Sequence, residues 1–492
     1  MELIGPVALV ASLVTYVAIG FYGSAQNHRS SFFHIAGVRK GVIALVVANV
    51  TLGTGLAYLL TAGSMNGLLV LSIAFGVFTG YWLLSIFLAS LPDSLTGAGG
   101  NLLMCFRNAI ESQRPASKTH GRSVFDAAIL IPLVAAFIMF FAYEIFVSSK
   151  IIAAVAFPES GAYTTQLVAV LIFVAALAYC LVGGMAAVYT TAIIQLIGIL
   201  LFLGLITYAS VATITASQFP IAQQFLYRGD KQALINCLTG FTDAVATQFY
   251  SLINAFGASH LRATKQKARL MRINGAILAA IFSLIILIGT STPHEIAADI
   301  GAYVSRISSS LSSIPFGSAV LITLLVFGMV SVVISTADTL IVALTYFIYE
   351  NVGRREGAET SQDISSIRKL MATLFLISFF ALLALFSLQP NIFYLLLSIA
   401  SGPVVMAPLM VALGAISRTP GALGSVSDPW LAAFGGLFVI ASTASFTSLA
   451  LAPSLVPYAS LFHLSLSTVL ALALYLFVRT RRVGGGSDGR TL

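Results

Sequence analysis

Residues 334–341 read ISTADTLI and stand in the middle of a long apolar stretch. Four polar residues of this region share one face of a helix, since they occupy positions i, i+4, i+7 and i+8: Ser331, Ser335, Asp338 and Thr339. Hydroxyls alone could donate back to their own helix. A carboxylate at membrane depth is costly, however, and normally faces a cavity, a counter-charge or an ion. Hydroxyl and carbonyl oxygens with few charges suit a small, hard, monovalent cation such as sodium.

A second polar stretch, VANVTLGTGLAYL (47–59), places Asn49, Thr51 and Thr54 among apolar residues. Gly53 and Gly55 weaken the continuity of a helix, so backbone carbonyls could turn away from the helix towards a ligand. The alternative is that these small residues only let two helices pack closely. The stretch therefore indicates either a broken helix at a binding site or a tight helix contact.

The composition defines the elements that must position these residues. The chain has 492 residues, of which 58% are hydrophobic and only 9% are charged, whereas a soluble surface needs roughly a quarter charged residues. Apolar runs of about 20 residues recur from end to end. We therefore expect an all-α polytopic membrane protein with about 13 transmembrane helices. The expected ranges are 4–23, 41–65, 68–91, 125–155, 165–182, 187–212, 234–257, 273–291, 316–346, 369–388, 391–416, 429–450 and 456–478.

Motifs of soluble enzymes are not found in the sequence. The cysteines, Cys105, Cys180 and Cys237, have neither disulfide nor zinc spacing, and the six histidines form no cluster. Neither a nucleotide-binding loop nor a hydrolase motif occurs. We expect neither an enzyme nor an organic cofactor.

The positive charges predict the orientation. If the N-terminus is outside, most of the 25 lysine and arginine residues fall in inner loops, and the exceptions are Lys150, Arg228, Lys231 and Arg306. The positive-inside rule then places the N-terminus outside and the C-terminus in the cytoplasm. The same bias accounts for the net charge of +8 without a nucleic-acid partner. The lipid bilayer is the expected surrounding, in the plasma or bacterial inner membrane.

Two further acidic residues fall in predicted helices. Glu144 lies in the outer half of the range 125–155, and Asp243 in the outer half of 234–257. Either could contact a solute or carry a proton. Either could instead form a local salt bridge or contact water near the interface, and the sequence leaves both interpretations open.

Several segments, in the right order, resemble the sodium/solute symporter family. YCLVGGMAAVYTTAIIQLIGILL (179–201) is similar to that family's fifth core helix, and the segment 314–352, which contains STAD, is similar to its eighth. Further similar segments are SSFFHIAGVRKG (30–41), HLRATKQKAR (260–269) and SGPVVMAPLMVALGAISRTPGALGS (401–425). Several motifs in register make the resemblance stronger than any single motif.

The resemblance implies a fold of the leucine-transporter type, with two inverted repeats of five helices and a broken first helix in each. On this chain the repeats would cover about 41–212 and 234–416 within one transport domain, 1–492. One extra helix would precede them, at 4–23, and two would follow, at 429–450 and 456–478.

The resemblance also implies a central sodium site made of backbone carbonyls and hydroxyls. Aligned by motif, the carbonyls belong to Val47, Val50 and Val332, and the hydroxyls to Ser335 and Thr336. Carbonyl ligands tolerate a change of side chain, and both hydroxyls are present. All elements of the implied site are therefore found in this sequence.

One position departs from the family's pattern. The aspartate of the fifth-helix motif, which serves a second sodium ion in some members, is Ala192 here, after Thr191. Asp338 and Thr339, one turn beyond the hydroxyl pair, could supply a second ion site together with Thr191. Alternatively, the second ion is absent, or Asp338 carries a proton.

These features predict sodium-coupled symport of a small polar organic solute by a monomer. The residues expected to line the solute site are Asn49, Thr51, Thr54, Ser398 and Ser401. The alternatives are a proton-coupled transporter that uses Asp338 or Glu144, and a transporter-like sensor that binds a solute without accumulating it.

The orientation can be tested by labelling introduced cysteines from outside the cell. We expect an impermeant thiol reagent to reach a cysteine near Gly161 or Asp230 and to miss one near Lys265 or Arg355, because the basic loops stay inside. Reversed labelling would contradict the orientation.

Overall fold

The computed structural model describes residues 3–24, 38–89, 124–158, 161–217, 231–249, 267–292, 299–314, 317–349, 362–387, 412, 415–416 and 459–485. No β-strand occurs in this part of the chain. The two expected helices 391–416 and 429–450 fall almost entirely outside it. The total of about 13 helices and the repeat boundaries therefore stay predictions.

The described elements, in chain order, form a succession of helices. They are α1 (Ile4–Ser24), α3 (Val38–Asn49), the π-helical η1 (Leu52–Ala57), α4 (Tyr58–Asn66), the 3-10 turn η2 (Gly67–Val70), α5 (Leu71–Ala89), α8 (Val124–Ala156), α9 (Ala162–Ser217), α11 (Lys231–Phe249), α13 (Lys267–Thr290), α15 (Ile300–Ser312), α16 (Ser318–Ile348), α17 (Gln362–Ser387) and α21 (Ala459–Gly485).

Seven of the described spans are long and apolar enough to cross a bilayer. Large apolar side chains are exposed on their outer faces, among them Val10 and Val14 of α1, Ile197 and Leu200 of α9, and Phe380 of α17. Such surfaces would be unfavourable in water and are matched by hydrocarbon. The chain is thus an all-helical, multi-pass membrane protein, as its composition predicts.

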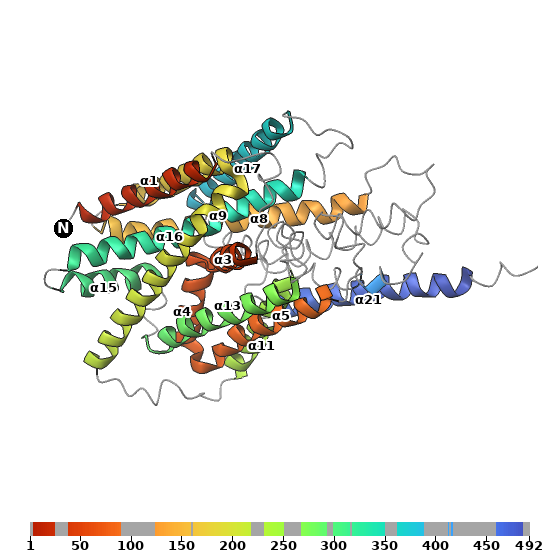
Figure 1. Cartoon of the computed structure of the whole chain (residues 1–492). Helices are drawn as coiled ribbons and strands as arrows, with labels where there is room; N and C mark the ends of the chain where they lie inside the picture. Colours follow the sequence, from red (N-terminus) through yellow and green to blue (C-terminus); the bar gives the residue numbers. More distant parts are fainter. Residues whose placement is uncertain are drawn as a thin grey trace, which may run out of the picture.

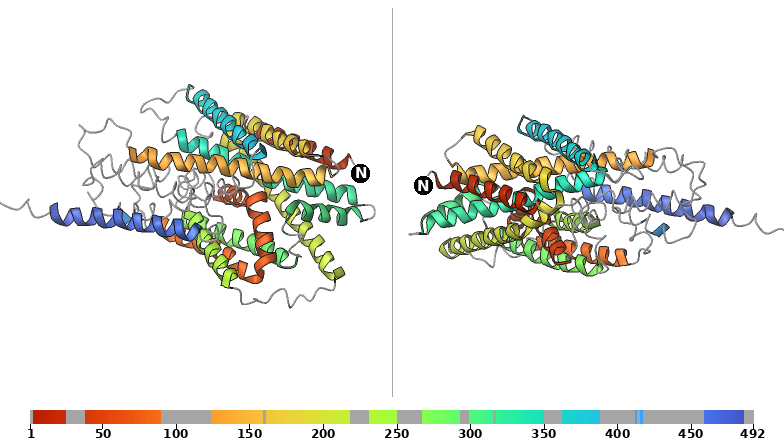
Figure 2. Two further views of the ribbon diagram at one scale, coloured as in Figure 1. Left: turned by 180° about the vertical axis from the view of Figure 1, so that it is seen from behind. Right: turned by 45° about the horizontal axis from the view of Figure 1, so that its top comes forward.

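Helix α16 forms the centre of the described structure. Its residues are all buried from Gly328 to Phe347, and it packs against α1, α3, α8, α9, α15 and α17. Figures 1 and 2 show α1, α8 and α16 running alongside one another, while α5, α11 and α13 form a second group. Helix α3 lies between the two groups, and α4 runs from it across to the second one. Polar groups on α16 are therefore surrounded by several helices.

Helix α9 bends sharply at Gly184, where the backbone has φ 52° and ψ −138°. A left-handed φ strains residues that carry a Cβ and is readily adopted by glycine. The bend falls between the two expected helices, 165–182 and 187–212, so the boundary predicted there corresponds to a change of direction within one long helical segment.

Helix α15 is an element that the sequence did not predict. It has 13 residues, too few and too polar for a membrane span, but it is amphipathic: Tyr303, Val304, Ile307 and Leu311 are buried. Asp299 caps its start by accepting from the backbone N–H groups of Gly301 and Ala302, at 2.9 and 3.2 Å. Long apolar runs, which indicate membrane spans, give no sign of such a helix.

Candidate functional site

The predicted break within residues 47–59 lies between α3 and η1. Helix α3 ends at Asn49, Thr51 is extended (φ −105°, ψ 145°), and the chain resumes as a π-helix at Leu52 that runs directly into α4. Thr51 contributes its carbonyl to this turn by accepting from the N–H of Leu56, at 3.0 Å. The interruption releases carbonyls at the end of α3 from the regular i to i+4 pattern.

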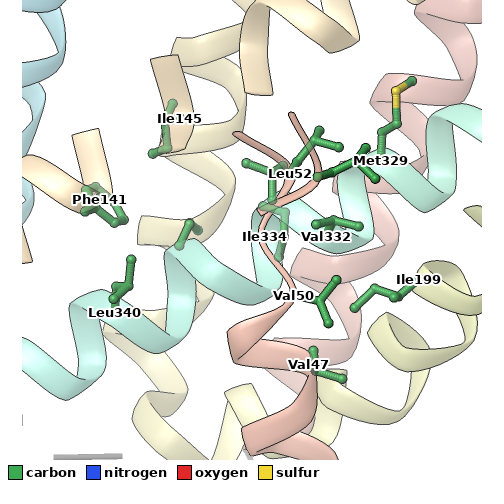
Figure 3. Close-up of a cluster of buried hydrophobic side chains, with 14 of the residues drawn as sticks. Val47, Val50, Leu52, Phe141, Ile145, Ile199, Met329, Val332, Ile334 and Leu340 are labelled. Carbon is green, nitrogen blue, oxygen red and sulfur yellow. The ribbon is translucent and has the colours of Figure 1, made fainter. Parts of the chain in front are cut away.

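Two hydroxyls of α16 face these released carbonyls. Ser335 Oγ lies 2.7 Å from the carbonyl oxygen of Val332 and 3.2 Å from that of Val47. Thr336 Oγ1 lies 3.3 Å from the same Val332 oxygen and 3.5 Å from the oxygen of Val50. All five residues are buried, and the side chain of Val50 lies beside Val332 of α16 and Ile199 of α9 (Figure 3). The structure thus brings together the five residues predicted from the resemblance.

The oxygen atoms of this cluster suit a hard cation as ligands. Two hydroxyls carry two protons, whereas the cluster contains three carbonyl oxygens, so oxygen lone pairs also face one another. The five oxygen-bearing groups are neutral. A monovalent cation would therefore add a single positive charge, and oxygen is the ligand that hard cations prefer.

Asp338 lies one turn beyond this cluster and is fully buried. Its Oδ2 accepts from the hydroxyl of Tyr179 and from Nε2 of Gln195, the latter at 3.0 Å, and its Oδ1 accepts from Thr339 Oγ1 at 3.1 Å. These donors are all neutral. Thr339 thus joins Asp338 as expected, whereas the Thr191 hydroxyl bonds to carbonyls of its own helix, at 2.9 and 3.1 Å.

Tyr179 and Gln195 were not predicted as functional residues. They lie on opposite sides of Gly184, where α9 bends, so they belong to two differently oriented parts of this helix. Gln195 is part of the motif that carries the family resemblance, which was the one available signal. Nothing in the sequence identified Tyr179 as a partner of α16.

The polar face of α16 continues towards its N-terminus at Ser331. The Ser331 hydroxyl lies 2.6 Å from the carbonyl oxygen of Phe327 and 2.6 Å from the hydroxyl of Tyr16, on α1. The α9 residue Gly198 lies so close that an added Cβ would collide with the Ser331 side chain. The predicted face of α16 is therefore divided among α1, α3 and α9.

Glu144 is buried in α8 and contacts the other side of the break. Its Oε1 accepts from the backbone N–H groups of Leu52 and Gly53, at 2.7 and 2.8 Å, and from Ser148 Oγ at 3.3 Å. Its side chain lies in the protein interior. Its carboxylate occupies the start of η1.

The residues expected to line the solute site are only partly described. The Asn49 side chain donates to the carbonyl of Leu45 on its own helix, at 2.6 Å, and the Thr51 side chain is buried at the break. Thr54 lies within η1. Ser398 and Ser401 lie outside the described residues, so the structure does not bring this predicted set together.

Comparison with known proteins identifies the class of fold. No protein-family model and no curated protein matches the sequence. A solved structure described as the substrate-bound outward-open state of a Na⁺-coupled sialic acid symporter is similar over 97% of this chain and 98% of that one, with 14% identity and a TM-score of 0.67. A second, MhsT in complex with L-phenylalanine, is similar over 88% of this chain and 99% of that one, with 16% identity and a TM-score of 0.57.

These likenesses place the chain in the leucine-transporter class of folds, as the resemblance implied. At such low identity they show the fold alone. Membership of the sodium/solute symporter family stays a prediction that rests on the motifs.

The contact between Tyr179 and Asp338 can be tested by stability. We expect Tyr179→Phe to lower the free energy of unfolding by about 1–3 kcal/mol, because a buried carboxylate loses a hydrogen-bond donor. Thermal unfolding of the detergent-purified protein measures the effect. Tyr208→Phe is the matched control, since Tyr208 lies on the same helix and is exposed. Equal effects of the two substitutions would contradict a specific role for the Tyr179 hydroxyl.

Proposed function

We propose that this protein is a secondary active transporter that couples sodium to the movement of a small polar organic solute by alternating access. The observation that carries this proposal is the convergence of the Val47, Val50 and Val332 carbonyls with the Ser335 and Thr336 hydroxyls at a helix break. The Na⁺-coupled symporter of similar fold supports it. In this proposal the protein catalyses no chemical reaction.

The geometry explains how an ion could drive a conformational change. The proposed ligands come from two separate elements, the end of α3 and the middle of α16. Sodium bound between them favours the conformation in which they are close over any conformation in which they separate. A ligand shifts an equilibrium through such a difference in affinity. The solute would then bind to the conformation that sodium stabilises.

The proposed solute site adjoins the break. Thr51 and Thr54 follow the Val50 carbonyl directly, and Asn49 precedes it. With Ser398 and Ser401 these residues would supply hydroxyl and amide groups, which suit a small polar solute. We propose that the protein works as a monomer, with its N-terminus outside the cell and its C-terminus in the cytoplasm.

We further propose that Asp338 serves a second cation, in place of the aspartate that the family pattern puts at Ala192. The three side chains that donate to it are neutral, it is buried, and it lies one turn from the proposed sodium ligands. Thr339, whose hydroxyl donates to Asp338 Oδ1, would supply a second oxygen ligand to this cation. Proton coupling through Asp338 or Glu144 and a sensing role are the competing functions that the experiments must separate.

Removing either hydroxyl ligand tests the central site. We expect Ser335→Ala and Thr336→Ala each to raise the sodium concentration for half-maximal stabilisation by about tenfold, equivalent to about 1.4 kcal/mol, because one ligand is lost while the helix backbone stays. Sodium-dependent thermal shifts of the purified protein measure this without knowledge of the solute. Thr345→Ala is the matched control, since that buried hydroxyl bonds to its own helix at Ile341. An unchanged sodium dependence in both ligand variants would exclude the site.

The number of sodium ions tests the proposal for Asp338. Mutual repulsion disfavours a second sodium unless a carboxylate compensates. We therefore expect the wild type to bind two sodium ions and Asp338→Asn to bind one. Equilibrium binding of radioactive sodium counts the sites. Two sites that persist in Asp338→Asn, or a single site in the wild type, would contradict the proposal. A single site that becomes two in Ala192→Asp would assign the compensating carboxylate to position 192 instead.

A further inference from the structure

Glu144 caps a helix that belongs to another part of the chain. The first residues of a helix have backbone N–H groups without partners inside that helix. At the start of η1 these groups belong to Leu52 and Gly53, and both donate to Oε1 of Glu144, at 2.7 and 2.8 Å. The residue before the turn, Thr51, makes no side-chain cap. The cap is therefore supplied by α8, across 92 residues of sequence.

The contact requires a close approach that the sequence permits at one position. A Cβ added at Gly53 would lie 2.9 Å from Val147 Cβ and 3.1 Å from Glu144 Oε2. Either distance is tighter than ordinary packing, so any larger residue would push η1 away from α8. Gly53 thus has a second role beyond weakening the helix: it lets the carboxylate reach the N–H groups.

In other proteins, a helix start such as that of η1 often binds the anionic group of a ligand. Backbone N–H groups at a helix start, together with the positive end of the helix dipole, favour a carboxylate or phosphate. Broken helices in transporters direct this end at anionic groups of their substrates. Here a protein carboxylate already occupies both donors, and Ser148 holds that carboxylate from one turn along α8, at 3.3 Å.

We propose that the Glu144 carboxylate permanently occupies the backbone N–H groups at the start of η1. It thereby fixes the position of the break and excludes solutes that would bring a carboxylate to the same groups. An approaching carboxylate would find both donors taken and would face a like charge, which is the repulsive element that specificity requires. The solute is therefore polar and carries no carboxylate at the end that meets η1. This assignment of solute class rests on the proposed transport function.

Glu144 also acts as a positioning residue for the proposed ion site. The two N–H groups that it holds follow Val50 and Thr51 directly, on the other side of the break from the Val47 carbonyl. Losing the cap lets the start of η1 move, and the Val50 carbonyl moves with it. The carboxylate thereby affects sodium binding without touching the ion.

The test removes the Glu144 carboxylate by substitution and supplies a small carboxylate in solution to replace it. We expect formate to raise the unfolding temperature of Glu144→Ala by several degrees in a saturable way, because it binds the folded state at the vacated N–H groups. Wild type and Glu144→Gln should show no such shift, since a side-chain oxygen still occupies the donors. Choline formate is compared with choline chloride in the absence of sodium, so that the result does not depend on sodium coupling.

Asp299→Ala is the matched control. Asp299 also caps a helix start with its carboxylate, at Gly301 and Ala302, but in an exposed position where water can replace it. Formate should therefore not stabilise this variant. A formate effect in Glu144→Ala no larger than in Asp299→Ala or wild type would overturn the proposal.

A sodium titration adds a second readout. We expect Glu144→Ala to bind sodium about tenfold more weakly in chloride, and formate to restore most of that loss. If Glu144→Ala does not fold in chloride, its recovery as a monodisperse protein is compared with and without formate. A variant that stays unfolded in formate, while Glu144→Gln folds in chloride, would overturn the proposal.

The solute class is tested on the wild type. Matched compounds that carry an alcohol, an amine or a carboxylate on the same skeleton are compared by thermal shift. Preferential stabilisation by the carboxylate would contradict the exclusion even if the formate experiment succeeds. An unchanged sodium dependence in both Ser335→Ala and Thr336→Ala would instead count against the transport function and leave the role of Glu144 standing.

Discussion

The broken helix between Asn49 and Leu52 is governed by one constraint: at membrane depth every backbone N–H and C=O needs a partner within the protein. A break releases both kinds of group at once. Here two different helices supply the partners, because α16 brings hydroxyls to the carbonyls and α8 brings a carboxylate to the N–H groups. Placing α3 and η1 therefore requires α8 and α16 to lie where they do.

The same constraint explains the central position of α16. Its polar face would be unfavourable against lipid, and each of its groups contacts a different neighbour: Ser331 meets α1, Ser335 meets α3, and Asp338 meets α9. Polar contacts thus bring three helices onto one face, and apolar packing fills the space between them. The contacts that satisfy this polar face also bury the candidate ion site, so residues that hold α16 in place lie beside, or among, those proposed to bind the ion.

Residue type alone predicted the polar face and left the stretch 47–59 as either a break or a tight helix contact, because glycines and a carboxylate within an apolar run are unfavourable unless a bound group or a close contact compensates for them. The family resemblance implied the break. Residue type could not predict their partners. Tyr179 and Gln195 meet at Asp338 only because α9 bends at Gly184, and Tyr16 gives no signal beyond being an aromatic residue in an apolar helix. Glu144 was recognised as unusual, but its role depends on a turn 92 residues earlier in the chain. Helix α15 was not predicted because its stability comes from one packed face.

The separations along the chain have a consequence for biosynthesis. Glu144 follows the N–H groups of the break by 92 residues in sequence. Thr336 and Ser335 follow the carbonyls that they contact by 286 and 288 residues, and Ser331 follows Tyr16 by 315. Since synthesis proceeds from the N-terminus, Glu144 of α8 can bind the N–H groups of Leu52 and Gly53 long before α16 leaves the ribosome. The nascent protein therefore passes through a stage in which the Val47 and Val50 carbonyls already lie at the break and still lack the hydroxyls of α16. Insertion of α16 into this partly assembled bundle is then the step that completes the candidate ion site.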